Sequence, residues 1–271
     1  MKKDRICSEE HRKYLLGQRR RTAFVWAMRI AILLLFFALW ELFAATGVID
    51  SFISSSPSRI ARTIRELWTE NDLLMHIGIT LYETLMGFAI ATAAGTLIAL
   101  LLWMSDTLRR ILEPYIVVLN SLPKIALGPI IIVWFGSGSK SIIFMAVLIT
   151  VIVTIITMMN GFLATDGNKI LLLRSMGATK MQILRKLVIP GSVPTFISML
   201  KINVGMAWIG SIMGEYLVSR AGLGYLIVYG GQVFKLDLVM AATLILCVLA
   251  AGMYALVALL EKLVIRYETN D

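Results

Sequence analysis

Long apolar runs separated by short polar segments dominate the pattern of this 271-residue chain. Six runs each reach about 20 residues, the length that a helix needs to cross the hydrocarbon core of a bilayer. They lie at residues 22–46, 77–104, 115–135, 141–165, 190–217 and 238–260. The pattern predicts an all-α, polytopic membrane protein with about six transmembrane helices, in which residues 22–271 form one transmembrane domain.

The composition excludes a soluble enzyme. Hydrophobic residues make up 58% of the chain and charged residues 16%, and the mean hydropathy is +0.82. A single globular core of this size cannot bury so much apolar surface. The longest polar segment between the runs has roughly 30 residues. No nucleotide-hydrolysing domain fits into it, so we expect the chain itself to bind no ATP.

The distribution of lysine and arginine predicts the orientation. If the N-terminus is cytoplasmic, the inner segments carry 17 of the 26 basic residues, the outer segments carry 6, and the other three lie within the runs. Positive residues accumulate on the cytoplasmic side of membrane proteins. Both termini are therefore expected in the cytoplasm, with residues 1–21 as a basic cytoplasmic segment. The net charge of +9 then needs no nucleic-acid partner.

Small residues recur at four-residue intervals in the second and fifth runs. The positions are Gly87, Ala91, Gly95 and Ala99, and then Gly210 and Gly214. This spacing places small side chains along one helix face, where another helix can approach closely. Tight packing within one subunit is the simpler interpretation, and a subunit interface is the alternative.

Cysteine and histidine provide no metal or catalytic pattern. Cys7 and Cys247 have no CxxC partner, so neither a disulfide framework nor a metal site is expected. His11 and His76 stand alone in polar segments, and we expect both to be solvated surface residues. The segment at 136–141, GSGSKS, does not match the spacing of a phosphate-binding loop and is interpreted as a tight extracytoplasmic turn.

Polar residues within the runs are candidates for a translocation path, because such residues are costly in a membrane. Pro123 should break the third run, which would bring Asn120, Ser121 and Lys124 together. The fifth run contains three further polar residues, which are Lys201, Asn203 and Glu215. A polar path between helices is one interpretation. The alternative is that Lys201 extends to the inner interface, that Glu215 reaches the outer one, and that Lys124 only pairs with a backbone carbonyl at the helix break.

The cytoplasmic segment 166–190 is too apolar for a free loop. Its sequence is DGNKILLLRSMGATKMQILRKLVIP, in which apolar and basic residues alternate and Gly177 separates two short helical stretches. An exposed apolar helix–turn–helix on the inner face implies a protein partner or the membrane surface.

This segment resembles a known motif. The stretch from Leu171 to Pro194 is similar to the conserved cytoplasmic loop of permease subunits in binding-protein-dependent ABC importers, written EAA, three residues, G, about nine residues, I-x-L-P. Gly177 matches the glycine, and Val188-Ile189-Pro190 and Pro194 match the end. At Leu171 the family has a glutamate, and at Leu172 and Leu173 it has alanines, so a salt bridge made by that glutamate would be absent here.

Further passages resemble the nitrate, sulfonate and taurine permease group. They are LNSLPKIALGPIIIVWFGSGSKSIIF from Leu119 to Phe144, SSPSRI around Pro57, and AWIGSIMGEYL and AGLGYLI between Ala207 and Ile227. The resemblance extends from about Phe52 to the C-terminus. The basic N-terminal segment lies outside the family pattern.

The resemblance implies a type I ABC importer permease. Two permease subunits, expected here as a homodimer, would form the path, two ATPase subunits would bind ATP and Mg²⁺, and an extracytoplasmic binding protein would deliver the solute. The coupling residues implied by the loop motif are Leu171, Leu172, Leu173, Arg174, Met176, Gly177, Ala178 and Thr179. The path residues expected from the spans are Asn120, Ser121, Pro123, Lys124, Asn203 and Glu215.

The solute itself is not determined by the sequence. The resemblance implies an anion such as nitrate, a sulfonate or taurine, or a related small organic molecule. A carrier driven by an ion gradient and a membrane-embedded enzyme are the alternative classes. The chain lacks the internal repeats of many secondary transporters and has no histidine within a span.

Overall fold

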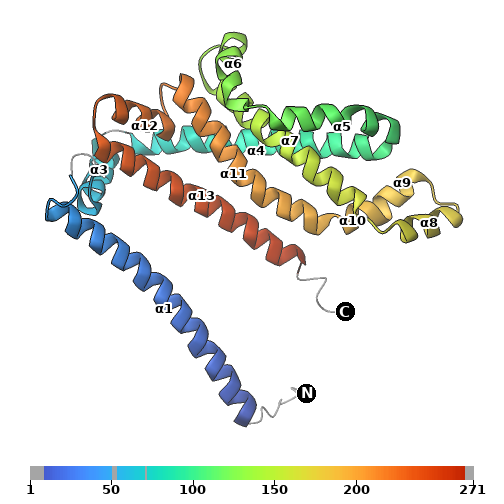
Figure 1. The fold of residues 1–271 in the computed structure, drawn as a ribbon, viewed down its shortest axis with the longest axis horizontal. Helices are drawn as coiled ribbons and strands as arrows, with labels where there is room; N and C mark the ends of the chain where they lie inside the picture. The colour runs from blue at the N-terminus through green and yellow to red at the C-terminus, as the bar shows by residue number, and fades with distance from the viewer. Residues whose placement is uncertain (1–8, 51–53, 71, 266–271) are drawn as a thin grey trace. The chain divides into compact units, whose positions relative to one another are not determined.

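The computed structural model describes residues 9–50, 54–70 and 72–265, and within these ranges the regular structure is helical with no strand (Figure 1). Five helices are long and apolar enough to cross a membrane, and a bent pair of helical segments supplies a sixth crossing if it counts as one span. The prediction of an all-α protein with about six spans is confirmed. The chain divides into two units at Thr63/Ile64.

The first unit contains one long apolar helix, α1, which runs from Glu9 to Ala45. The expected span began at residue 22, but the helix continues through the basic stretch before it. No residue of its apolar stretch, Arg20–Ala45, is buried. A helix that is apolar on all sides needs lipid or another protein around it. Near the C-terminal end of α1, the Glu41 carboxylate accepts hydrogen bonds from the amide of Ser58, at 3.0 Å, and from its hydroxyl, at the start of α3 (Pro57–Glu70).

The second unit is built around three helices, α4 (Leu73–Met104), α7 (Ser139–Leu163) and α11 (Val193–Val218), and α7 packs extensively against both of the others. Gly87 packs against Ala146, and Gly95 packs against Thr154. On α11, a β-carbon at Gly210 would lie 2.5 Å from the Cα of Ala146. The two small-residue stripes therefore serve packing within one chain, as the simpler interpretation predicted.

Two further helices pack on α11. They are α12 (Leu223–Gln232) and the long apolar α13 (Leu236–Ile265). Lys201 on α11 and Glu261 on α13 form an ion pair with Nζ and Oε2 2.5 Å apart. Lys201 thus has a partner inside the second unit, Glu261, which neither interpretation of its role had named.

The third expected span is sharply bent. It consists of α5 (Asp106–Ser121), a short 3₁₀ turn (η1, Lys124–Leu127) and α6 (Gly128–Phe135), with an angle of 87° across the break. Pro123 lies at the break, as expected. The helix begins at residue 106 rather than 115, because the Ser105 hydroxyl accepts a hydrogen bond from the Leu108 amide and caps it.

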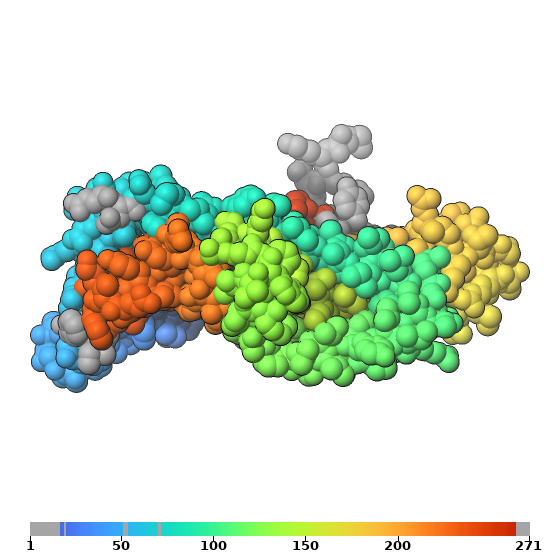
Figure 2. Space-filling view, turned by 90° about the horizontal axis from the view of Figure 1, so that it is seen from above, coloured from blue at the N-terminus to red at the C-terminus, as the bar shows by residue number. Residues whose placement is uncertain are grey.

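The segment after α7 contains α8 (Gly167–Ser175), α9 (Lys180–Ile183), a π-helical turn (η2, Leu184–Val188) and α10 (Ile189–Gly191). Figure 2 shows α8 and α9, in yellow, at one end of the second unit. The N-terminal end of α7 follows the turn at Gly136–Gly138, in which both glycines have a positive φ. The expected tight turn is confirmed, and it lies at the opposite end of α7 from α8 and α9.

Candidate functional site

The helix–turn–helix around Gly177 forms as predicted. Gly177 has φ +80°, a left-handed conformation that glycine adopts without steric cost. The amides of Gly177 and Ala178 donate to the carbonyls of Arg174 and Leu173, both at 2.9 Å, and close the end of α8. Thr179 then begins α9 with reciprocal side-chain and backbone bonds to Gln182. The turn therefore has a defined shape.

This segment has an inner and an outer apolar face. Leu173 and Ala178 pack against the buried cluster that contains Ile183 and Val188. On the outer face, the side chains of Leu171, Leu172 and Met176 are 66%, 60% and 74% exposed. Apolar exposure of this kind on a well-packed turn is typical of a docking surface.

The break between α5 and η1 brings together the polar residues that the sequence predicted there. Lys124 Nζ donates to the backbone carbonyl of Asn120 at 3.2 Å and lies 3.5 Å from its side-chain oxygen. The Ser121 hydroxyl donates to the Val118 carbonyl at 2.8 Å. Asn120, Ser121 and Pro123 are exposed and Lys124 is half-buried. These groups form a polar patch on the surface of the second unit.

Asn203 lies elsewhere, in the core between the three central helices, and is fully buried. Its side-chain amide donates to the hydroxyls of Thr92 on α4 and Thr154 on α7, at 3.0 and 2.9 Å. Such bonds join helices where an unpaired polar group would be costly. In this conformation Asn203 connects three helices rather than facing a surface.

Glu215 belongs to a third polar group, near the end of α11. Its Oε2 accepts a hydrogen bond from the Gly224 amide at 2.5 Å. The adjacent Leu223 amide bonds to Thr80, so the Glu215 carboxyl lies beside the face of α4 that carries Thr80 and Glu83. The side chain is 1% exposed. Among the residues that the structure describes, no hydrogen bond links Glu215, Asn203 and the polar patch at the α5–η1 break, so the expected path residues fall into three separate groups.

His76 is also part of this third group, and the expectation of a solvated surface residue was wrong for it. Its Nδ1 accepts a hydrogen bond from the Gly222 amide at 2.9 Å, and the ring stacks on Tyr225. Thr80, one turn further along α4, accepts from the Leu223 amide at 2.8 Å. The α11–α12 turn needs these acceptors because its buried amides lack helical partners. The other histidine, His11, lies outside the residues whose side chains are described.

Sequence reasoning singled out neither Thr80 nor Glu83. A signal for them exists in the helical spacing, since His76, Thr80 and Glu83 precede Gly87 at intervals of three and four residues. They continue the small-residue stripe of α4 toward its N-terminus on the same face. Polar residues that continue a helix face used for packing indicate that this face makes buried polar contacts with the segment that packs against it.

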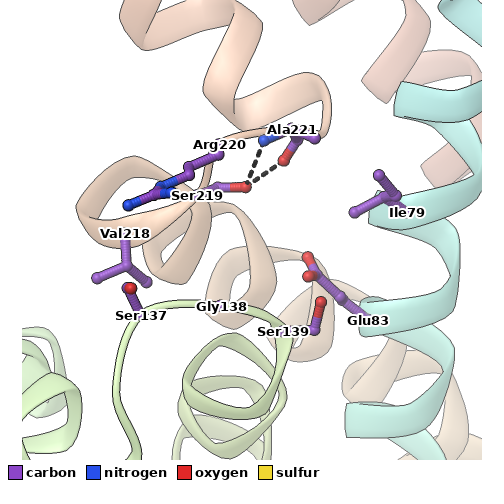
Figure 3. A pocket seen from close by; sticks show the side chains of 9 residues that line it. All are labelled: Ile79, Glu83, Ser137, Gly138, Ser139, Val218, Ser219, Arg220 and Ala221. Carbon is purple, nitrogen blue, oxygen red and sulfur yellow. Dashed lines mark hydrogen bonds between the residues drawn. The ribbon is translucent and has the colours of Figure 1, made fainter.

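A pocket of about 310 Å³ lies beside this group. It is lined by Ile79, Glu83, Ser137, Gly138, Ser139, Val218, Ser219, Arg220 and Ala221. Figure 3 shows Glu83 projecting from α4 toward Ser139, while Arg220 extends away from Glu83. The pocket lies at the end of the helices opposite to α8 and α9.

A bundle of apolar helices with an exposed helical loop at one end and polar groups buried between its central helices defines a polytopic membrane transport subunit. Residues 84–266 match the model of the family described as binding-protein-dependent transport system inner membrane component, and the chain belongs to this family. It is a transmembrane permease subunit of an ATP-driven ABC importer.

Individual relatives agree with the family. A probable ABC transporter permease protein of Haemophilus influenzae is 31% identical over 80% of this chain and 87% of that protein. A putative aliphatic sulfonates transport permease protein, SsuC, of Bacillus subtilis is 25% identical over 92% of this chain and 91% of its own length. Both matches cover most of the chain.

The fold has solved counterparts. A chain of a bacterial ABC transporter involved in the import of the acidic polysaccharide alginate superposes with a TM-score of 0.64. The superposition covers 92% of this chain and 98% of that one, at 13% sequence identity. The predicted importer permease fold is thereby confirmed.

Proposed function

We propose that two copies of this chain form the translocation path of an importer, with one ATPase subunit docked on the α8–α9 segment of each copy. The outer face of Leu171, Leu172 and Met176 carries this proposal, because three large apolar side chains lie exposed on a turn of defined shape. An apolar groove on the ATPase would remove them from water. Arg174, also exposed, would lie at the edge of this contact.

The same arrangement orients the chain. ATP is cytoplasmic, so a docked ATPase places α8 and α9 in the cytoplasm, in agreement with the 17 basic residues of the inner segments. Both termini would then be cytoplasmic, and the pocket beside Glu83 would open toward the extracytoplasmic side. A binding protein would deliver the solute there. ATP and Mg²⁺ would be bound by the partner ATPase alone.

The solute we propose is a small anion of the nitrate, sulfonate or taurine type, or a related small organic molecule. The polar patch at the α5–η1 break supports an anion, because the Lys124 ammonium lies there between exposed polar groups. A positive charge in a region of low dielectric favours a negatively charged ligand. The name of the Bacillus subtilis relative, an aliphatic sulfonates permease, agrees with this class.

Reconstitution tests this function. The chain and its ATPase are placed in proteoliposomes with ATP enclosed on the ATPase side, and the binding protein is added on the opposite side. The uptake of labelled sulfonate or taurine is then measured. We expect uptake that stops on addition of vanadate and persists when ion gradients are collapsed. Uptake that survives vanadate and disappears with the gradient would instead identify a secondary carrier. The purified complex should contain permease and ATPase in equal numbers, with two copies of each.

A further inference from the structure

Two glutamates from different helices meet in the interior of the second unit. Glu83 on α4 and Glu215 on α11 are each 1% exposed. The turn whose Gly224 amide donates to Glu215 also donates, through Leu223, to Thr80, about one helical turn before Glu83, and this brings the two carboxyl groups close together. One oxygen of each, Glu83 Oε2 and Glu215 Oε1, has no hydrogen-bond partner. In the part of the chain that the structure describes, neither carboxyl forms an ion pair with lysine or arginine.

Two neighbouring carboxylates that are each 1% exposed are poorly solvated, and without a cationic side chain paired to them they cannot both keep a negative charge. A cation must therefore accompany the pair. Two carboxyl groups this close to each other suit a proton shared between their oxygens, as in other carboxyl dyads. A metal ion would need several further oxygen ligands, and among the described residues no third Asp, Glu, His or Cys joins the pair to form a group that could hold one.

The surroundings of the pair are built closely around it. A β-carbon at Gly222 would lie 2.6 Å from the Glu215 carboxyl carbon, and one at Gly224 would lie 2.7 Å from its Oε2. These two glycines let the α11–α12 turn close over the carboxyl. The Gly224 amide donates to Oε2, and the adjacent Leu223 amide donates to the Thr80 hydroxyl on α4. The turn is thus fitted to the carboxyl pair.

The pair also has a route to solvent. Glu83 lines the 310 Å³ pocket beside Ser139 (Figure 3). The titratable or charged groups nearby are His76 on α4, Tyr216 on α11 and Arg220 in the turn. His76 already accepts a hydrogen bond from Gly222, and Arg220 extends away from Glu83.

We propose that Glu83 and Glu215 form a binding site for a single proton, reached through this pocket, and that the bound proton joins α4 to the end of α11. The proposal goes beyond the transport function, since it depends neither on the solute nor on the ATPase. It makes the pocket end of the bundle a place where proton binding holds three segments together: α4, α11 and the turn that follows α11.

Infrared spectroscopy of the full-length chain in lipid nanodiscs tests the proposal. At neutral pH the wild type should show the carbonyl-stretch band of a protonated carboxyl, shifted when H₂O is replaced by D₂O. The band should be lost in the double variant Glu83→Gln/Glu215→Gln. It should remain in Glu66→Gln, a matched control that removes an exposed carboxyl on α3. Absence of the band from the wild type, or its persistence in the double variant, would overturn the proposal.

Two additional measurements keep the test decisive. If the double variant does not assemble, the single variant Glu215→Gln replaces it. The side-chain amide of the glutamine can donate a hydrogen bond to the Glu83 carboxylate in place of the shared proton, so the band should still vanish. The second is cation replacement, in which the wild-type spectrum is recorded in sodium, in potassium and in choline with a chelator present. A proton site gives the same band in all three. A band that appears or disappears with the alkali cation would show a metal-cation site and refute the single-proton assignment.

Discussion

The polar patch at the α5–η1 break and the buried polar bonds of α4, α7 and α11 contain similar residues in opposite surroundings. Asn120 and Lys124 form local bonds within four residues and lie at the surface of the second unit. Asn203 is fully buried and bonds to side chains that precede it by 111 and 49 residues in sequence. One asparagine is available to a ligand or a partner, and the other joins helices.

The difference teaches that a polar residue in an apolar run has two distinct uses. Where a proline breaks the helix, the freed backbone groups and nearby side chains remain accessible, which suits contact with solute. Where the helix is continuous and faces small residues, the polar group is enclosed and must be satisfied by neighbouring helices. Substitutions should therefore affect assembly in the core and transport at the break.

The largest effect is expected in the core, at Gly210. Replacing it by alanine would place a β-carbon 2.5 Å from the backbone Cα of Ala146, which cannot move without displacing α7. We expect a loss of about 3 kcal/mol in stability, seen as loss of the monodisperse peak in size-exclusion chromatography. Gly205→Ala on the same helix is the matched control, because nothing lies within 4 Å of a β-carbon there. Equal behaviour of the two variants would contradict this packing.

Asn203→Ala should have the next largest effect. It leaves the hydroxyls of Thr92 and Thr154 without their donor, at a cost of about 1–3 kcal/mol. The thermal unfolding midpoint in detergent should fall, whereas Asn120→Ala at the surface should leave it unchanged. If the two asparagine variants lowered the midpoint equally, the distinction between core and break would not hold.

Gly177→Val should leave the helical bundle folded and weaken ATPase binding. A β-branched residue at φ +80° costs roughly 1–2 kcal/mol or more, and the turn would change shape to avoid it. The expected result is about tenfold weaker association with the ATPase in a pull-down titration. Gly167→Val in the same segment is the control, since this glycine has an ordinary φ and an open side. Wild-type association in Gly177→Val would remove this turn from the coupling site.

Lys124→Met should have the smallest effect on stability, within about 0.5 kcal/mol, because the side chain lies at the surface and bonds only to its own segment. Uptake should nevertheless be lost while assembly and basal ATP hydrolysis remain. Poor assembly would instead indicate that the lysine stabilises the helix break. Normal uptake in a well-assembled variant would exclude Lys124 from the path.

Much of the architecture could be predicted because it depends on local composition. Five spans coincide with apolar runs, and their ends shift by a few residues except where α1 continues into its basic stretch and α13 runs on to Ile265. The start of the third expected run also moved, from residue 115 to residue 106, because the Ser105 side chain caps the helix there. The sequence also predicted two special backbone positions, the turn at Gly177 and the helix break at Pro123. Of the candidate site, the α8–α9 turn and the cluster at the break followed from sequence for the same reason.

What the sequence by itself determined is therefore the number of crossings, the small-residue packing faces and the exposed helical turn, all set by residues within a few turns of one another. Only the tertiary structure decided which polar groups face inward and what they meet. Glu83 and Glu215 stand 132 positions apart, and His76 bonds to an amide 146 residues away. Periodicity gives the face of a helix on which a residue lies, but the segment that packs against that face depends on how all the helices assemble.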